Sequence, residues 1–201
     1  MTSRSRRAPP PLDSGAGVFM KYIVAIFLIF TSIAAYAGLD KVAVPTGTGL
    51  KLMWWPKVTP PKGWHFDQGS SYYFSCNAMA PDGATFSKAE TVMYAKADYK
   101  PRLPAPITLQ AFVNNDMTSF KKETAKIVIV REPSLRFGKK QRCQLVFYHP
   151  AMGSQGNWEQ VAYCEDGAYF LTFAVSSRTH AGLQAAMPAF RSMFSSYHVG
   201  P

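Results

Sequence analysis

The sequence predicts a single α+β domain, in which a mainly antiparallel sheet is flanked by helices. Two features support this fold class. The C-terminal half contains apolar runs separated by short turn signals, as in strands that follow one another in hairpins. Two other segments place apolar residues at helical spacing, and such amphipathic helices need a sheet face to pack against.

Three strands are expected before the first helix, at residues 49–55, 71–80 and 91–97. The segment "PKVTPPKGW" ends the first strand, and the turn "PDG" follows the second. Proline and glycine at these positions are typical of loops and turns. The proline-rich segment "KPRLPAP" then leads toward the helix.

A helix is expected over residues 108–124, where the Thr108 hydroxyl can cap its start. Its apolar residues recur at helical spacing: Leu109, Phe112, Val113, Met117 and Phe120. The next segment, "KIVIV", is typical of a short apolar strand.

Residues 141–149 and 158–166 are predicted strands joined by the loop "PAMGSQGN". The hairpin signal Asp166-Gly167 leads into a further strand at residues 168–176. In this register Cys164 lies opposite Cys143 on one side and Tyr169 on the other. One face then collects the apolar residues Cys143, Leu145, Phe147, Ala162, Cys164, Tyr169, Leu171, Phe173 and Val175.

The last expected element is a helix over residues 179–197. Its apolar stripe contains Leu183, Met187, Phe190 and Phe194. Pro188 is expected to kink this helix or to begin its second half.

Cys143 and Cys164 are candidates for a disulfide. The predicted register makes them a hydrogen-bonded pair, with Cα atoms about 5.5 Å apart, and disulfides span such distances. Two buried free thiols are the alternative, because unpaired cysteine is commonly buried. Cys76 is left without an assigned partner, and no cysteine lies in a CxxC motif.

Residues 1–37 are predicted to be a secretory signal peptide. The strongly apolar run "YIVAIFLIF" weakens into "TSIAAYA", which predicts cleavage between Ala37 and Gly38. An uncleaved anchor is the alternative, in which case the protein would contact a membrane only through this leader. Met20 is an alternative start of translation. Cleavage would release a periplasmic or secreted protein.

The predicted domain, residues 38–201, carries 18 basic and 11 acidic residues, a formal charge of +7. Residues 121–142 alone contain eight Lys or Arg and two Glu. This segment is either a patch for an anionic partner or a solvated helix end and loop. The candidate patch residues are Lys121, Lys122, Lys126, Arg136, Lys139, Lys140 and Arg142. Nucleic acid is not an expected partner, because the leader directs export and no binding module is recognisable.

No catalytic or cofactor motif is found: HExxH, GxSxG and glycine-rich phosphate loops are absent from the sequence. A metal site would require the fold to bring His149 and His180 together with a carboxylate. The adjacent Trp54 and Trp55 are candidate interface residues. As strand neighbours they point to opposite faces, so that one of them can be exposed.

Several short motifs resemble the PsbP-like (DcrB-like) fold group. They are "PPKGW" near the start of the domain, a closing strand with the sequence "YFLTFAVS", and a terminal helix with a Pro188–Phe190 step and a Ser196-Tyr197 end. The resemblance implies an α/β/α sandwich and a binding or accessory role. It implies no catalytic residues, because the members of this group share none.

We therefore expect an exported, non-catalytic accessory protein that binds an envelope protein or an anionic envelope component. Two other classes stay open. One is a hydrolase whose site assembles only in the fold, and the other is an inhibitor or immunity-like partner of a secreted effector.

Overall fold

The computed structural model describes residues 38–104, 108–124, 126–137 and 141–197. All of them belong to one compact unit, Tyr36–Pro201. The predicted leader, residues 1–37, and the alternative start at Met20 lie outside the described residues. No helix within the described ranges is long and apolar enough to cross a membrane.

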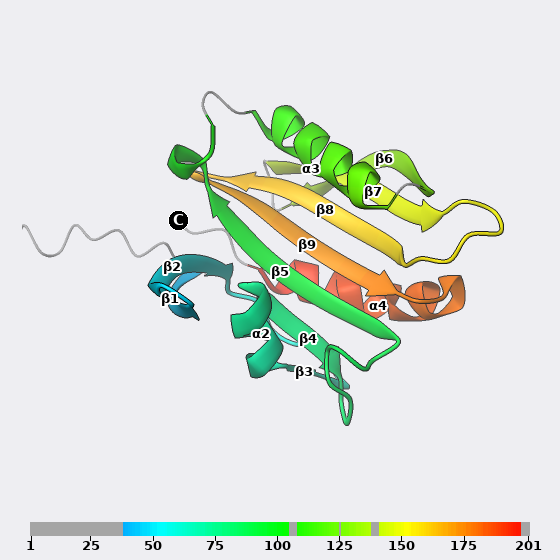
Figure 1. Ribbon diagram of the computed structural model, residues 1–201, viewed down its shortest axis with the longest axis horizontal. Coiled ribbons are helices and arrows are strands. Elements are labelled where there is room, and N and C mark those ends of the chain that lie inside the picture. Colours follow the sequence, from blue (N-terminus) through cyan, green and yellow to red (C-terminus); the bar gives the residue numbers. More distant parts are fainter. Residues whose placement is uncertain (1–37, 105–107, 125, 138–140, 198–201) are drawn as a thin grey trace, which may run out of the picture. The chain divides into compact units, whose positions relative to one another are not determined.

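In this part of the chain nine strands form one antiparallel sheet (Figure 1). Its main order is β1-β2-β5-β9-β8-β7-β6, and β3 pairs with β4, which pairs with β5. The strands are β1 (Leu39–Thr46), β2 (Gly49–Pro56), β3 (Trp64–Phe66), β4 (Asn77–Pro81), β5 (Thr91–Tyr99), β6 (Ile127–Phe137), β7 (Gln141–Pro150), β8 (Trp158–Asp166) and β9 (Tyr169–Ser177).

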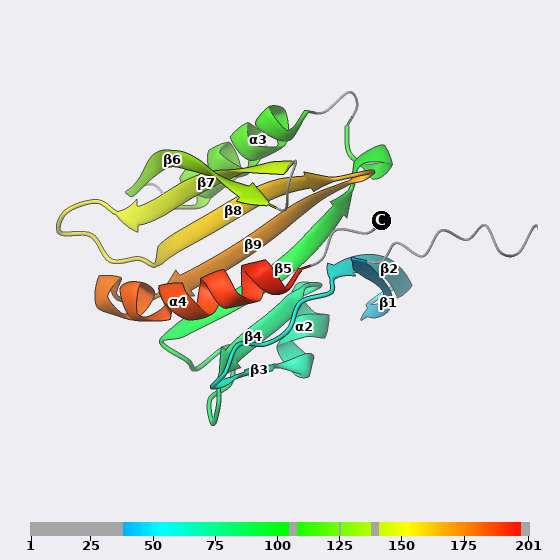
Figure 2. The ribbon, with the colours of Figure 1, turned by 180° about the vertical axis from the view of Figure 1, so that it is seen from behind.

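Helices cover both faces of this sheet. Helix α3 (Leu109–Glu123) packs on one face, and α4 (His180–Ser196) packs on the other (Figures 1 and 2). The short helix α2 (Gln68–Phe74) packs beside β4, and the 3-10 turn η1 (Lys100–Arg102) follows β5. The predicted α+β class is confirmed.

Each of the two long helices closes a separate core. On the α4 face the predicted apolar residues of β7, β8 and β9 are buried, except that Phe147 is partly buried. Helix α4 adds Leu183, Phe190, Met193 and Phe194 to this core. The core on the α3 face contains Val113, Ile127, Val146, Tyr148, Val161, Tyr163 and Ala174.

The prediction of a strand over residues 71–80 is wrong in its first half, which belongs to helix α2. Aromatic residues favour strands, but local capping decides otherwise here. The Asp67 carboxylate accepts a hydrogen bond from the Ser70 N–H at 3.0 Å, and Ser75 ends the helix in the left-handed conformation with φ of 56°.

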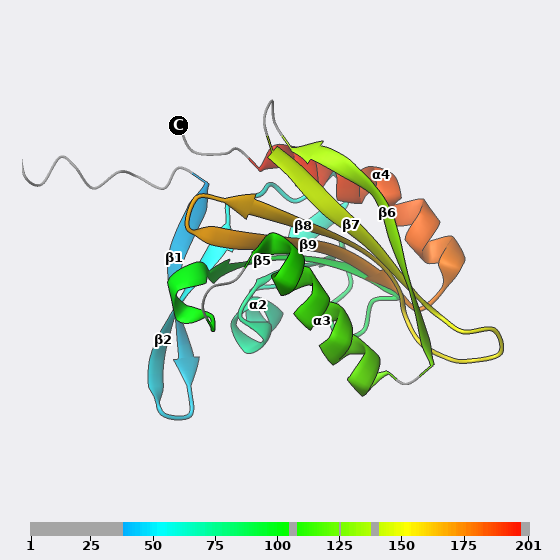
Figure 3. The same cartoon turned by 90° about the horizontal axis from the view of Figure 1, so that it is seen from above.

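Strand β1 was not predicted, because its polar residues hide the strand pattern. It pairs along its whole length with β2, from Leu39 opposite Pro56 to Thr46 opposite Gly49. This hairpin extends from one end of the sheet (Figure 3) and joins β5 through the single pair Trp54 and Ala97.

The turn between β8 and β9 lies one residue later than predicted. Asp166 pairs with Tyr169, so Gly167 and Ala168 form the loop, and Gly167 has a φ of 51°. Glycine tolerates this left-handed conformation. Cys164 therefore pairs with Leu171, but the buried face is unchanged because the partner moves by two residues.

One strand runs further than predicted, and the last helix continues past its proline. Strand β6 continues for 11 residues, well beyond "KIVIV". Helix α4 is a single element through Pro188, because Phe190, Met193 and Phe194 are buried beyond it and hold the second half against the sheet.

Candidate binding surfaces

The basic segment lies at one edge of the sheet. Lys121 and Lys122 occupy the last turn of α3, and Lys126 directly precedes β6. All three side chains are exposed, and none forms an ion pair with a described residue. Because Lys121 and Lys122 lie in the last turn of α3, their positive charges also interact favourably with the negative end of the helix dipole.

The remaining predicted patch residues are only partly described. Arg136 and Arg142 lie on the paired backbones of β6 and β7, while their side chains fall outside the described part of the structure. Lys139 and Lys140 lie wholly outside it.

A groove of about 510 Å³ runs between α3 and β6. We call it the α3–β6 groove, and it is lined by Asn114, Met117, Thr118, Lys121, Ile127 and Ile129. It thus combines apolar side chains with polar groups and one lysine. Sequence reasoning found the charge but not the groove, because helix and strand meet only in the fold.

Arg131 adds a further charge beside this groove. Its guanidinium donates hydrogen bonds to Asn114 Oδ1 at 2.5 Å and to Gln144 Oε1 at 3.1 Å. Arg131 therefore links β6 to α3 and to β7. Sequence reasoning did not single out this residue.

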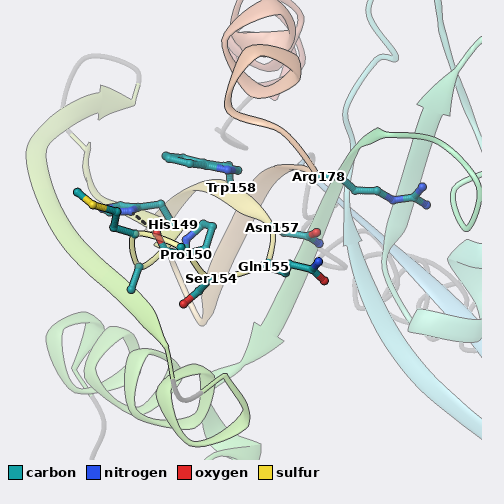
Figure 4. A pocket seen from close by; sticks show the side chains of 11 residues that line it. His149, Pro150, Ser154, Gln155, Asn157, Trp158 and Arg178 are labelled. Atoms are coloured by element: carbon teal, nitrogen blue, oxygen red, sulfur yellow. Dashed lines mark hydrogen bonds between the residues drawn. The ribbon is translucent and has the colours of Figure 1, made fainter.

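A second hollow, of about 770 Å³, is formed by the loop between β7 and β8. Its lining consists of residues 149–158 and Arg178. Figure 4 shows His149 beside Trp158, whereas the guanidinium of Arg178 points away from both. The ionisable side chains that line this pocket therefore do not converge on one point.

Trp158 separates the two histidines that a metal site would require. Its indole stacks on His149 with ring centroids 5.3 Å apart and contacts His180 at 4.5 Å. Within the described ranges, no three His, Cys, Asp or Glu side chains are placed to hold a metal ion. The two histidines therefore serve as ring contacts of Trp158.

Neither tryptophan of the predicted pair is fully exposed in the structure. Trp55 is 8% exposed. Trp54 is partly buried against the α4-side core. Its ring lies 5.1 Å from that of Tyr99, and the Arg102 guanidinium covers it at 4.6 Å. An aromatic and a basic side chain thus cover part of the Trp54 indole.

A disulfide joins Cys143 and Cys164, with 4.4 Å between their Cα atoms. This spacing is typical of a non-hydrogen-bonded pair, so the expected pair type is wrong. The shifted β8–β9 turn explains the change. It makes Cys164 and Leu171 a hydrogen-bonded pair, so the pair that Cys164 forms with β7 on its other side is non-hydrogen-bonded. Cys76 is a buried free thiol. Burial raises its pKa to about 12, which keeps it protonated and unreactive.

Buried polar side chains lie on the α3 face of the sheet. The Tyr163 hydroxyl donates to Asp116 on α3 and is 2.8 Å from the Tyr148 hydroxyl. Burial raises the pKa of Tyr163, and the charge of Asp116 raises it further. Glu159 accepts a hydrogen bond from Ser176 Oγ at 2.8 Å. Sequence reasoning missed these partners, because each comes from a different element.

Two further carboxylates, Glu90 and Glu165, also have partners in the structure. Glu90 accepts from the Thr179 hydroxyl at 2.5 Å, and Glu165 pairs with Lys100. Both contacts are structural and lie outside the two hollows described above.

Known proteins resemble this chain only in the fold of solved structures. No protein-family model matches the sequence, and no curated protein matches it. A Pseudomonas aeruginosa protein of unknown function has a similar structure, with a TM-score of 0.46 and 12% identity over 81% of this chain and 99% of that one.

The cyanobacterial PsbP protein of Synechocystis superposes with a TM-score of 0.42 and 13% identity, over 84% of this chain and 95% of that one. The chain therefore bears a weak structural resemblance to PsbP. With both TM-scores below 0.5, neither structure carries an argument about activity or partners.

Proposed function

We propose that the chain is an exported, non-catalytic accessory protein that binds an acidic partner protein of the cell envelope at the α3–β6 groove. The observation that carries this proposal is the groove itself, where apolar side chains lie beside exposed lysines. Lys121, Lys122 and Lys126 have no acidic partner among the described residues.

A protein partner fits this surface better than a lipid headgroup. Met117, Ile127 and Ile129 line the groove beside its polar groups. Protein interfaces combine an apolar centre with a polar rim in this way, whereas headgroup binding needs charge alone.

Export is supported by the disulfide, because such bonds persist in oxidising compartments. The leader supports it independently. Cleavage between Ala37 and Gly38 would leave the whole sheet intact, since β1 begins at Leu39. The mass of the protein recovered from the extracytoplasmic fraction tests this step. We expect an N-terminus at Gly38, and a retained leader would contradict cleavage.

A non-catalytic role is supported by the loop pocket between β7 and β8. Its ionisable side chains, His149 and Arg178, point apart (Figure 4). Nucleophilic catalysis needs a nucleophile and a base within hydrogen-bond reach of each other. The hydrolase alternative therefore gains no support from this pocket.

The binding proposal is tested with immobilised polyglutamate at low salt. We expect the variant Lys121→Glu/Lys126→Glu to bind about tenfold more weakly, because two attractive charges become repulsive. The control Lys41→Glu/Lys51→Glu makes the same change in net charge at exposed residues of the β1–β2 hairpin. Equal weakening by both variants would show attraction by net charge alone and contradict a site at the groove.

A further inference from the structure

We infer that the acidic partner is bound as an extended peptide segment that adds a strand to the free edge of β6. This inference rests on the proposed function and specifies the form in which the partner is recognised. The first observation is the position of β6, which ends the sheet order and pairs with β7 alone among the described strands. Its outer edge therefore presents backbone N–H and C=O groups that no described strand pairs with. The Ile127 N–H is the exception, because it donates to the Thr124 carbonyl at 3.2 Å.

One stretch of this edge lacks the usual protection against strand addition. Proline, charged residues and bulges commonly block exposed edges. Here Pro133 and the register shift between Glu132 and Leu135 lie in the second half of β6. The first half, residues 127–130, is an uninterrupted apolar run, and it is therefore where a strand can add.

Both faces of this stretch offer apolar contacts. Ile127 and Ile129 line the α3–β6 groove together with Met117. Val128 and Val130 point to the opposite face, because side chains alternate along a strand, and they are 36% and 41% exposed. Alternate side chains of an added strand would meet these two surfaces in turn.

Charge selects the partner. The exposed charges around the open stretch are four basic and two acidic side chains: Lys121, Lys122, Lys126, Arg131, Glu123 and Glu132. An acidic peptide complements this excess. A second copy of the chain would bring two basic edges together, and like charges at an interface disfavour pairing.

These steps define the ligand as a segment of about six residues, within the usual length of a strand. It alternates apolar residues, preferably β-branched, with acidic residues. The apolar residues meet the groove or the exposed valines, and the acidic residues lie beside the lysines.

The test uses a blocked, fluorescent peptide of about six residues with alternating Val and Glu, within strand length. Two versions are N-methylated, one at the odd positions and one at the even positions. Since a strand directs every second N–H to the same edge, one version blocks pairing with β6 and the other leaves it intact. Polyglutamate of the same charge is the charge-only control.

We expect the plain peptide to bind and to slow hydrogen exchange of the backbone amides within residues 128–130, because the Ile127 N–H is already bonded to the Thr124 carbonyl. One methylated version should bind about tenfold more weakly, a loss of the size expected for a missing backbone hydrogen bond. The variant Val128→Ser/Val130→Ser should also lose binding, because it removes the apolar contacts of one face without changing the charge. Because both valines are partly exposed, the circular dichroism of this variant should match that of the unaltered protein.

Three other outcomes would overturn the inference. If both methylated versions and polyglutamate bind as well as the plain peptide, without slowed exchange in β6, the contact is by charge alone and the proposed function still stands. If neither the plain peptide nor polyglutamate binds, the proposed function fails as well. If ultracentrifugation shows a dimer that Val130→Lys dissociates, a second copy occupies the edge.

Discussion

Cys143 on β7 lies directly opposite Cys164 on β8, with 4.4 Å between the Cα atoms and a disulfide between the side chains. The bond closes the β7–β8 hairpin at the end opposite its loop and joins residues 21 positions apart. It also lies in the core on the α4 face. The disulfide therefore links two neighbouring interior strands of the sheet.

Removing this bond should destabilise the fold. We expect the variant Cys143→Ala/Cys164→Ala to lower the free energy of unfolding by about 3 kcal/mol, because a loop of this length gains freedom in the unfolded chain. Urea unfolding with and without reductant measures the effect. Cys76→Ala is the control and should keep the response of the native protein to reductant. An identical curve in both conditions would contradict a stabilising disulfide.

Gly69 and Gly182, the two glycines within the described helices, should respond oppositely to alanine. A methyl group at Gly182 would lie 2.5 Å from Ser177 Oγ and 2.7 Å from Glu90 Oε1, so Gly182→Ala should cost about 1–3 kcal/mol. At Gly69 the nearest atom would be Asp67 Oδ1 at 3.7 Å. Gly69→Ala should therefore stabilise α2 by up to about 1 kcal/mol. Thermal unfolding compares the two variants. Equal shifts of the melting temperature would rule out crowding at Gly182.

Glu159 should make stability fall as the pH rises. Burial raises its pKa above the ordinary value of 4.5, and the hydrogen bond from Ser176 opposes part of this shift. A raised pKa in the folded state means that the folded protein holds the proton more tightly. The stabilisation is then complete below pH 4.5 and is lost as the pH rises through the folded-state pKa.

The variant Glu159→Gln removes this titration. Its free energy of unfolding should decline less steeply than that of the unaltered protein as the pH rises above 4.5. Urea unfolding at a series of pH values measures the slopes. Glu132→Gln is the control, because it makes the same charge change at an exposed site on β6. Parallel curves for Glu159→Gln and the unaltered protein would refute the role of burial.

The two buried tyrosines should be energetically coupled. Since Tyr163 donates to Asp116, the 2.8 Å contact is a hydrogen bond from the Tyr148 hydroxyl to Tyr163. Tyr163→Phe removes that acceptor and should cost about 1–3 kcal/mol. The double variant with Tyr148→Phe should cost less than the two single changes together. Tyr73→Phe, at a site 82% exposed, is the control, and strictly additive costs would exclude the coupling.

Most of the sheet and both long helices could be predicted from residue pattern. The strands β7, β8 and β9 alternate apolar residues over enough positions to set their buried face, and that face proved robust to a turn shift. Helix α2 was missed, because the Asp67 cap outweighs the strand preference of Tyr72, Tyr73 and Phe74. Strand β1 was missed, because its partner β2 rather than its own pattern defines it.

The candidate site could be predicted only in part. The excess of lysine and arginine between residues 121 and 142 is visible in the sequence. The groove is not, because it needs one face of α3 beside one face of β6. The open edge is likewise absent from the pattern, since "KIVIV" looks the same in a central strand and in an edge strand.

By itself the sequence determined the α+β class, the buried face of β7–β9 and the position of the basic segment. These properties depend on periodicity and composition, which are local. Tertiary structure alone decided that β6 is the last strand of the sheet, that Trp54 is covered by Tyr99 and Arg102, and that Cys143 meets Cys164 as a close pair. Each of these three features depends on which segments, distant in the sequence, become neighbours in the fold. The order and register of the strands in the sheet determine those neighbours.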